Sequence, residues 1–167
     1  MLTPEECAEI KEDLLHSPTP RSACVDALKV VQRHRGWIDD DALGDVAELL
    51  DMSCAELDSV ATFYNLIFRK PVGEHVILVC DSISCWLTGY ETARELLEKK
   101  LNIKLGETTA DGKFTLLPTV CLGHCEIAPV MMIDGRIVGN LTQEKIDQAL
   151  ADALGVSPGK ESADDSL

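Results

Sequence analysis

The chain has 167 residues, of which 46% are hydrophobic, and its formal net charge at pH 7 is −14. That length is enough for one domain, or for a domain with a small appended one, to bury a core without help from disulfides. The excess of acids argues against binding to nucleic acids or anionic lipid surfaces, because both rely on Lys and Arg.

The chain carries no pattern typical of a membrane or secreted protein. No apolar run approaches the roughly 18 to 20 residues of a membrane span. The N-terminal sequence, MLTPEECAEIKEDLL, has acids where a signal peptide would carry a basic region. We therefore expect a cytoplasmic protein with reduced thiols, and clustered cysteines in such a protein are more often metal ligands or catalytic groups than disulfides.

Residues 1–72 are predicted to form a small helical bundle. The sequence TPEE at residues 3–6 is a capping box with proline at the first helical position, and a second helix is expected from about 21 to 35. Asp39 to Asp41 are expected to cap a third helix. A further capping box, SCAE at residues 53–56, predicts a short fourth helix.

The periodicity changes after the sequence Pro-Val-Gly at residues 71–73. Residues 75–80 read HVILVC, a continuous apolar run of strand length. A capped helix is expected from Thr88 to about Leu101, and a second strand from Lys113 to Pro118.

Two more strands and a final helix complete the predicted second domain, residues 73–155. Residues 130–133 and 136–139 flank Asp134-Gly135, a pair typical of two-residue hairpins, and Thr142 begins the last helix. The order β-α-β-β-β-α, with a parallel first pair, predicts a thioredoxin-like α+β domain. Residues 156–167 lack an apolar period and are expected to be a disordered tail.

Four of the seven cysteines stand in two close pairs, each expected to follow a strand. Cys80 and Cys85 form C-x4-C, and Cys121 and Cys125 form C-x3-C. Four thiolates suit a [2Fe-2S] cluster, a [4Fe-4S] cluster or zinc. The spacing matches neither the bacterial [4Fe-4S] nor the plant-type [2Fe-2S] run, and it is wider than the usual zinc C-x2-C. Spacing alone therefore leaves both iron–sulfur and zinc open.

Two other uses of these thiols fit the sequence poorly. Thiol–disulfide enzymes of thioredoxin-like fold use C-x-x-C, which does not occur here. A Rieske centre needs two histidines, and His124 is the only one near the pairs. We therefore interpret His124 as a loop residue beside the site. Backbone N–H groups in the loops 81–84 and 122–124 are expected to donate to the sulfurs.

The remaining candidates are weaker. Cys7, Cys24 and Cys54 lie outside the pairs, and a cysteine on a helix usually acts as a small apolar residue. The aromatic pair at residues 63–64 ends a helix, where a place in the core is the favoured interpretation. Contact with a partner or with the domain junction is the alternative. Trp86 follows Cys85 and either shields the site from water or contacts a partner.

Four stretches carry a resemblance to a known family. They are ATFY at 61–64, CDSISC at 80–85, GETTADGKFTL at 106–116 and CLGHCEIAPVMMI at 121–133. They resemble the E-type iron–sulfur subunit of respiratory NADH:quinone oxidoreductase, the complex I flavoprotein 2 family. The resemblance extends over residues 20–155, and both cysteine spacings match the family pattern.

The resemblance implies a fold, a cofactor and a ligand set. It implies a thioredoxin-like ferredoxin domain behind a helical bundle, with Cys80, Cys85, Cys121 and Cys125 all binding one [2Fe-2S] cluster. The chain would be an electron-transfer subunit of an NADH dehydrogenase, with no catalytic residue or complete active site of its own.

The resemblance also implies a partner and a location. The cluster would exchange one electron with the FMN of a flavin- and NADH-binding subunit of the F type, which alone binds FMN and NADH. The complex would lie at the cytoplasmic face of the inner (plasma) membrane, with this chain peripheral to it. Similar chains serve NAD-linked hydrogenases and formate dehydrogenases, and a zinc-stabilised interaction module is the alternative from another class.

Overall fold

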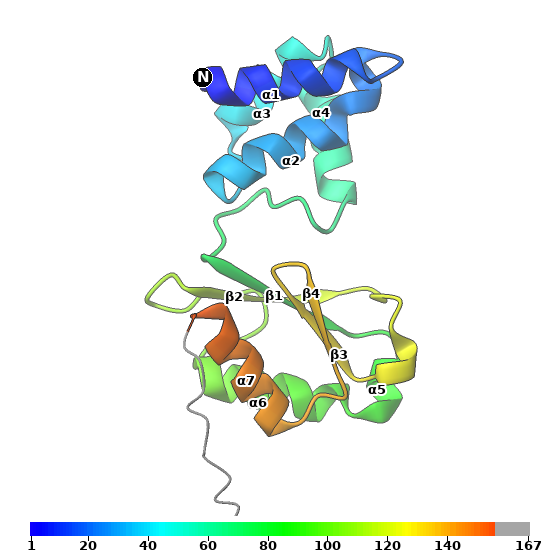
Figure 1. The fold of residues 1–167 in the computed structure, drawn as a ribbon, viewed down its shortest axis with the longest axis vertical. Coiled ribbons are helices and arrows are strands. Elements are labelled where there is room, and N and C mark those ends of the chain that lie inside the picture. Colours follow the sequence, from blue (N-terminus) through cyan, green and yellow to red (C-terminus); the bar gives the residue numbers. More distant parts are fainter. Residues whose placement is uncertain (156–167) are drawn as a thin grey trace, which may run out of the picture. The chain divides into compact units, whose positions relative to one another are not determined.

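The computed structural model describes residues 1–155, and the chain divides into two compact units between Val72 and Gly73 (Figure 1). The first unit is helical, and the second is built on a sheet. The tail expected to be disordered, residues 156–167, lies outside the described residues.

The first unit is a bundle of helices with the caps that the sequence predicts. Its elements are α1 (Pro4–Leu15), the 3-10 helix η1 (Pro20–Ala23), α2 (Cys24–Arg35), α3 (Asp40–Leu49) and α4 (Cys54–Phe63). Side-chain oxygens of Thr3, Asp39 and Ser53 accept N–H groups of the first turns that follow them. The second helix begins later than expected, because Pro20 opens a separate 3-10 turn before it.

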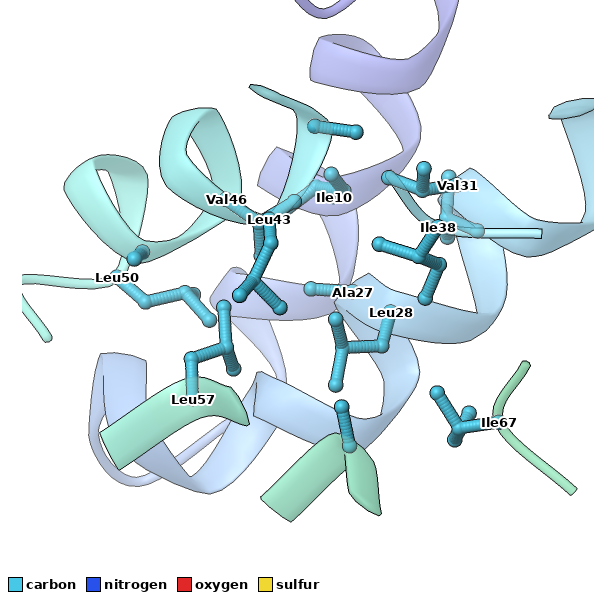
Figure 2. Packing of buried hydrophobic residues seen from close by; sticks show 14 residues of the cluster. Ile10, Ala27, Leu28, Val31, Ile38, Leu43, Val46, Leu50, Leu57 and Ile67 are labelled. Carbon is cyan, nitrogen blue, oxygen red and sulfur yellow. The ribbon is translucent and has the colours of Figure 1, made fainter. Parts of the chain in front are cut away.

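Apolar side chains from all four α-helices meet in the core of this unit (Figure 2). Leu28, Val46 and Leu57 are among those fully removed from solvent. One carboxylate, Glu6, is buried as well, and both of its oxygens accept hydrogen bonds from Arg35 at 2.7 Å. Those hydrogen bonds outweigh the effect of burial and lower the pKa of Glu6, so the bundle holds a charged pair.

The second unit contains a four-stranded mixed sheet. Its strands are β1 (His75–Cys80), β2 (Phe114–Thr119), β3 (Val130–Ile133) and β4 (Arg136–Gly139), in the order β2-β1-β3-β4. As predicted, β1 and β2 are parallel, whereas β3 is antiparallel to both β1 and β4. The predicted hairpin turn is confirmed, since Asp134 and Gly135 both have positive φ.

Three helices accompany the sheet: α5 (Ile83–Thr88), α6 (Tyr90–Leu101) and α7 (Gln143–Ala153). The crossover helix α6 and the last helix α7 lie on one side of the sheet (Figure 1). The sequence predicted a loop where α5 stands, because six residues are too few to show a helical period. Gly89, at φ +119°, ends α5 and separates it from α6, so the expected single helix from Thr88 begins instead at Tyr90.

Candidate metal centre

Both cysteine pairs lie at the carboxyl ends of the two parallel strands. Cys80 is the last residue of β1 and is aligned with Thr119, the last residue of β2. Cys121 follows two residues later, and the Asp81 N–H continues the ladder by donating to the Thr119 carbonyl at 3.1 Å. Parallel pairing therefore aligns Cys80 with a residue that lies 39 positions later in the sequence.

The first pair belongs to the interior of the sheet unit. Cys80 is 3% exposed and Cys85 is 2% exposed, and both pack in the hydrophobic cluster of this unit. Cys85 is placed by α5, whose first turn follows β1 almost at once. The two thiols are close enough to change each other's pKa.

The second pair lies at the surface. The sulfurs of Cys121 and Cys125 are 3.6 Å apart, and both residues are exposed. Gly123, at φ +83°, allows the chain to turn between them, and its N–H donates to the Cys121 sulfur at 3.4 Å. Cys125 then begins the 3-10 helix η2 (Cys125–Ile127).

The two pairs approach each other closely enough to interact. The backbone N–H of Leu122, from the second pair's loop, is near enough to lower the pKa of Cys80. The charge of Cys125 in turn acts on the buried Cys85. Figure 1 accordingly shows α5 and the turn after β2 at the same end of the sheet.

The buried thiols resist becoming charged together. Burial, a hydrogen bond to Cys80 and the nearby charges of Cys80 and Cys125 raise the pKa of Cys85 to about 11. Burial also opposes ionisation of Cys80, but N–H donors from Ser82 and Leu122 and the thiol of Cys85 lower its pKa overall. A bound cation would let all the thiols ionise, because its charge offsets theirs.

The thiol contacts are pairwise. Within residues 1–155, no three Cys, His, Asp or Glu side chains meet in an arrangement that holds a single metal ion. All seven cysteines are free thiols, and the four near β1 and β2 offer only soft sulfur donors. Two thiol pairs with backbone N–H groups directed at their sulfurs fit the needs of a [2Fe-2S] cluster.

One of the expected N–H donors is present, since the Gly123 N–H donates to the Cys121 sulfur. The backbone N–H groups of Ser82 and Leu122, also from the predicted segments, lower the pKa of Cys80. The Val130 N–H, which was not predicted, lowers the pKa of Cys85. Sequence reasoning missed Val130 because only the antiparallel pairing of β3 with β1 returns the chain to this site.

Exposed apolar side chains that neighbour the cysteines along the chain form what we call the apolar rim. We define it as the exposed side chains Ile83, Trp86 and Leu87 of α5 together with Val120. Trp86 is 53% exposed and stacks on Tyr90 with ring centroids 5.7 Å apart.

Two sequence interpretations have different outcomes. His124 is a loop residue beside the site, as predicted, and its Nδ1 lies 3.2 Å from Glu126 Oε1. The core interpretation of Phe63 was wrong: its side chain is 80% exposed and packs edge-to-face on Tyr64. The helix ends at Phe63, and the extended backbone of Tyr64 leads the chain away.

The other three cysteines lie in the first unit of the chain. Cys7, Cys24 and Cys54 all belong to the helical unit. Among the described residues, no helix combines the length and apolar character that crossing a membrane requires.

Comparison with known proteins places the whole described fold in a known group. Residues 10–154 match the family model of the thioredoxin-like [2Fe-2S] ferredoxins. The E-type subunit of NADH-quinone oxidoreductase from Escherichia coli (strain K12) is 48% identical over 149 residues, which cover 89% of this chain and 90% of that protein. The protein of the same name from Pseudomonas aeruginosa is 43% identical over 150 residues, 90% of each chain.

A solved structure shares the fold. A crystal structure of an NAD+-reducing [NiFe]-hydrogenase in the air-oxidised state superposes with a TM-score of 0.68 at 24% identity. The match covers 84% of this chain and only 24% of the hydrogenase chain.

Proposed function

The chain belongs to the thioredoxin-like [2Fe-2S] ferredoxin family, and we propose that Cys80, Cys85, Cys121 and Cys125 are the four ligands of its cluster. The observation that carries this proposal is the convergence of two thiol pairs at the carboxyl ends of β1 and β2. The contact between the Cys121 and Cys125 sulfurs and the burial of Cys80 and Cys85 are compatible with thiolates that would hold such a cluster.

Residues of the chain around the proposed cluster favour the negative charge that the cluster gains on reduction. When bound, the cluster supplies a one-electron redox centre. The thiolates would hold it. The Gly123 N–H donates to the Cys121 sulfur, and the N–H groups of Leu122 and Val130 lower the pKa of Cys80 and Cys85, so these groups favour negative charge on the sulfurs. Burial of the first pair keeps water from one side of the site.

The function that follows is electron transfer within an NADH dehydrogenase. The chain is an electron-transfer subunit of NADH-quinone oxidoreductase, as its relatives' names and their identity of 43–48% over nine tenths of the chain support. Service in an NAD-linked hydrogenase is the second candidate, which the shared fold supports at only 24% identity.

We assign the partner as the flavin- and NADH-binding subunit of the F type, which itself carries FMN and NADH. The apolar rim supports this assignment, because Ile83, Leu87 and Val120 are 68–77% exposed beside the thiols of a chain whose net charge is −14. A partner covering the rim would exclude water from the exposed thiol pair. The assembled complex would lie at the cytoplasmic face of the inner membrane, with this chain peripheral to it.

The test combines the purified full chain with an F-type subunit and NADH under anaerobic conditions. We expect a stable complex in which NADH reduces the [2Fe-2S] cluster by one electron. The reduced cluster of this chain should then give an electron paramagnetic resonance signal. A Cys121→Ala chain should bind the partner and lack that signal. A signal of equal strength from that variant, or a wild-type chain that is never reduced by NADH in the complex, would contradict the proposal.

A further inference from the structure

The second cysteine pair combines two properties that disulfide formation requires. The sulfurs of Cys121 and Cys125 lie 3.6 Å apart, and both residues are exposed. A disulfide has a sulfur–sulfur distance of about 2.05 Å, so the two sulfurs need to approach by roughly 1.5 Å. Rotation of the side chains supplies a movement of that size, because exposed side chains change rotamer rapidly.

The segment between the two cysteines favours closure of such a ring. Gly123, at φ +83°, turns the chain between them, and its N–H holds the Cys121 sulfur at 3.4 Å. Because the two thiols are joined by a short stretch of chain, each meets the other at a high effective concentration. Once one sulfur is oxidised, the other therefore reaches it before a second molecule of oxidant does.

The first pair and Cys54 each lack one of these properties. Cys80 and Cys85 are 3% and 2% exposed, so an oxidant reaches them only after local opening of the chain. Cys54 is exposed as well, but it is the only cysteine of α4. Among the described cysteines, the second pair therefore joins exposure to a second sulfur in contact.

We propose that Cys121 and Cys125 form a reversible disulfide in the cluster-free chain, and that this disulfide blocks loading of the cluster. The oxidant is a small-molecule disulfide such as oxidised glutathione. One cysteine thiolate attacks it, forms a mixed disulfide and releases one glutathione; the second thiolate attacks the protein sulfur and releases the other. The cysteines lose two electrons and two protons, and both glutathiones leave as thiols.

The blocking role rests on the proposed function of these cysteines as cluster ligands. A disulfide at the second pair removes two of the four proposed thiolates, so a cluster cannot be held while it persists. It also keeps the exposed thiols from the irreversible oxidation that ends in sulfinic and sulfonic acids. The first pair stays reduced in the core, so reduction of one bond restores the whole ligand set.

The first test treats the full cluster-free chain with oxidised glutathione and maps its thiols by mass spectrometry of peptides. The peptide that holds Cys121 and Cys125 should become lighter by two hydrogen atoms and carry no glutathione. Cys54 should carry a bound glutathione, whereas Cys80 and Cys85 should stay free thiols. In Cys125→Ser, the matched control, Cys121 should keep its glutathione, because no thiol is in contact to displace it.

The second test measures cluster loading from a scaffold protein that carries a preformed [2Fe-2S] cluster. Loading of the oxidised chain, followed by visible absorbance, should fall to less than about a tenth of that of the reduced chain. Treatment of the oxidised chain with dithiothreitol should restore loading. Cys54→Ser should respond as the wild type does, which shows that glutathione on Cys54 is not the cause.

Two results of the mapping would overturn the inference. One is stable glutathione, or free thiols, on both Cys121 and Cys125 after Cys54 has reacted, and the other is a disulfide that includes Cys80 or Cys85. An oxidised chain that loads as fast as the reduced one would overturn the blocking role. A chain that forms the disulfide but takes up no cluster when reduced is a different failure: it refutes the proposed function and leaves the disulfide in place.

Discussion

Cys80 and Cys85 are 3% and 2% exposed inside the hydrophobic cluster of the sheet unit, whereas Cys121 and Cys125 stand at the surface on a loop. The first pair sits on regular elements, at the end of β1 and within α5. The second depends on Gly123 and a single 3-10 turn. The difference indicates that the inner pair contributes to the hydrophobic core of the sheet unit, whereas the outer pair does not.

The largest expected effect is loss of the cluster, and it should be the same whichever pair loses a cysteine. Cys85→Ala and Cys121→Ala should each abolish nearly all of the cluster's visible absorbance, because a two-iron cluster in this family needs four thiolates. The control is Cys24→Ala in the helical unit, which should load as the wild type does. Equal loss of absorbance in all three variants would refute the ligand assignment.

Thiol labelling should separate the pairs most clearly. In the cluster-free chain, an alkylating reagent should modify Cys121 and Cys125 about a hundredfold faster than Cys80 and Cys85, since buried groups react only after local opening. Mass spectrometry of peptides from timed samples measures each rate. Similar rates for all four thiols would show that the first pair is not part of a stable core.

A smaller effect, on the rate of cluster release, should come from a side chain added next to the turn that carries Cys125. Gly139, opposite Val130 in the β3–β4 ladder, has no side chain, and an added Cβ would lie 2.4 Å from Cδ1 of Ile127 and 2.7 Å from its carbonyl oxygen. Ile127 ends the turn that begins at Cys125, so Gly139→Ala should displace this ligand. We expect the variant to release its cluster to a chelator up to about tenfold faster, within the usual effect of groups that support a metal ligand.

The control for this variant is an equally crowded glycine away from the cysteines. A Cβ at Gly73 would lie 2.8 Å from the Gly112 carbonyl oxygen, beyond the end of β1 opposite to Cys80. Gly73→Ala should therefore reduce the stability of the chain without changing the rate of cluster release. If both variants release the cluster at the same rate, general destabilisation and not the position of Cys125 is the cause.

The smallest expected effect concerns the stability of the cluster-free chain. Cys85→Ser places a hydroxyl among apolar side chains and should lower the free energy of unfolding by about 1–2 kcal/mol. Cys125→Ser changes an exposed side chain and should stay within about 0.5 kcal/mol of the wild type. Urea unfolding of the two variants measures the difference, and its reversal would contradict the assigned roles.

The sequence predicted the strands that frame the inner pair better than the details of the site. Apolar runs and the Asp134-Gly135 turn have local signals, and the thioredoxin-like fold class is confirmed by the family match over residues 10–154. The helix α5 was missed because its six residues show no period. The donor Val130 was missed because it reaches the site only through tertiary strand pairing.

Exposure and side-chain direction were the hardest to predict. Phe63 has the composition of a core residue, yet the end of α4 leaves it in solvent. Ser82 precedes α5 without capping it, whereas Ser53 caps α4. The ligand set itself stays a prediction from spacing and resemblance, supported by the convergence of the two pairs.

Metal and sulfide analysis of the anaerobically purified full chain tests most directly whether an inner and an outer pair share one cluster. We predict two irons and two sulfides per chain and a brown protein. After reduction by one electron, the cluster should give the electron paramagnetic resonance signal of a spin of one half. A colourless chain that carries one zinc and no sulfide would contradict the account.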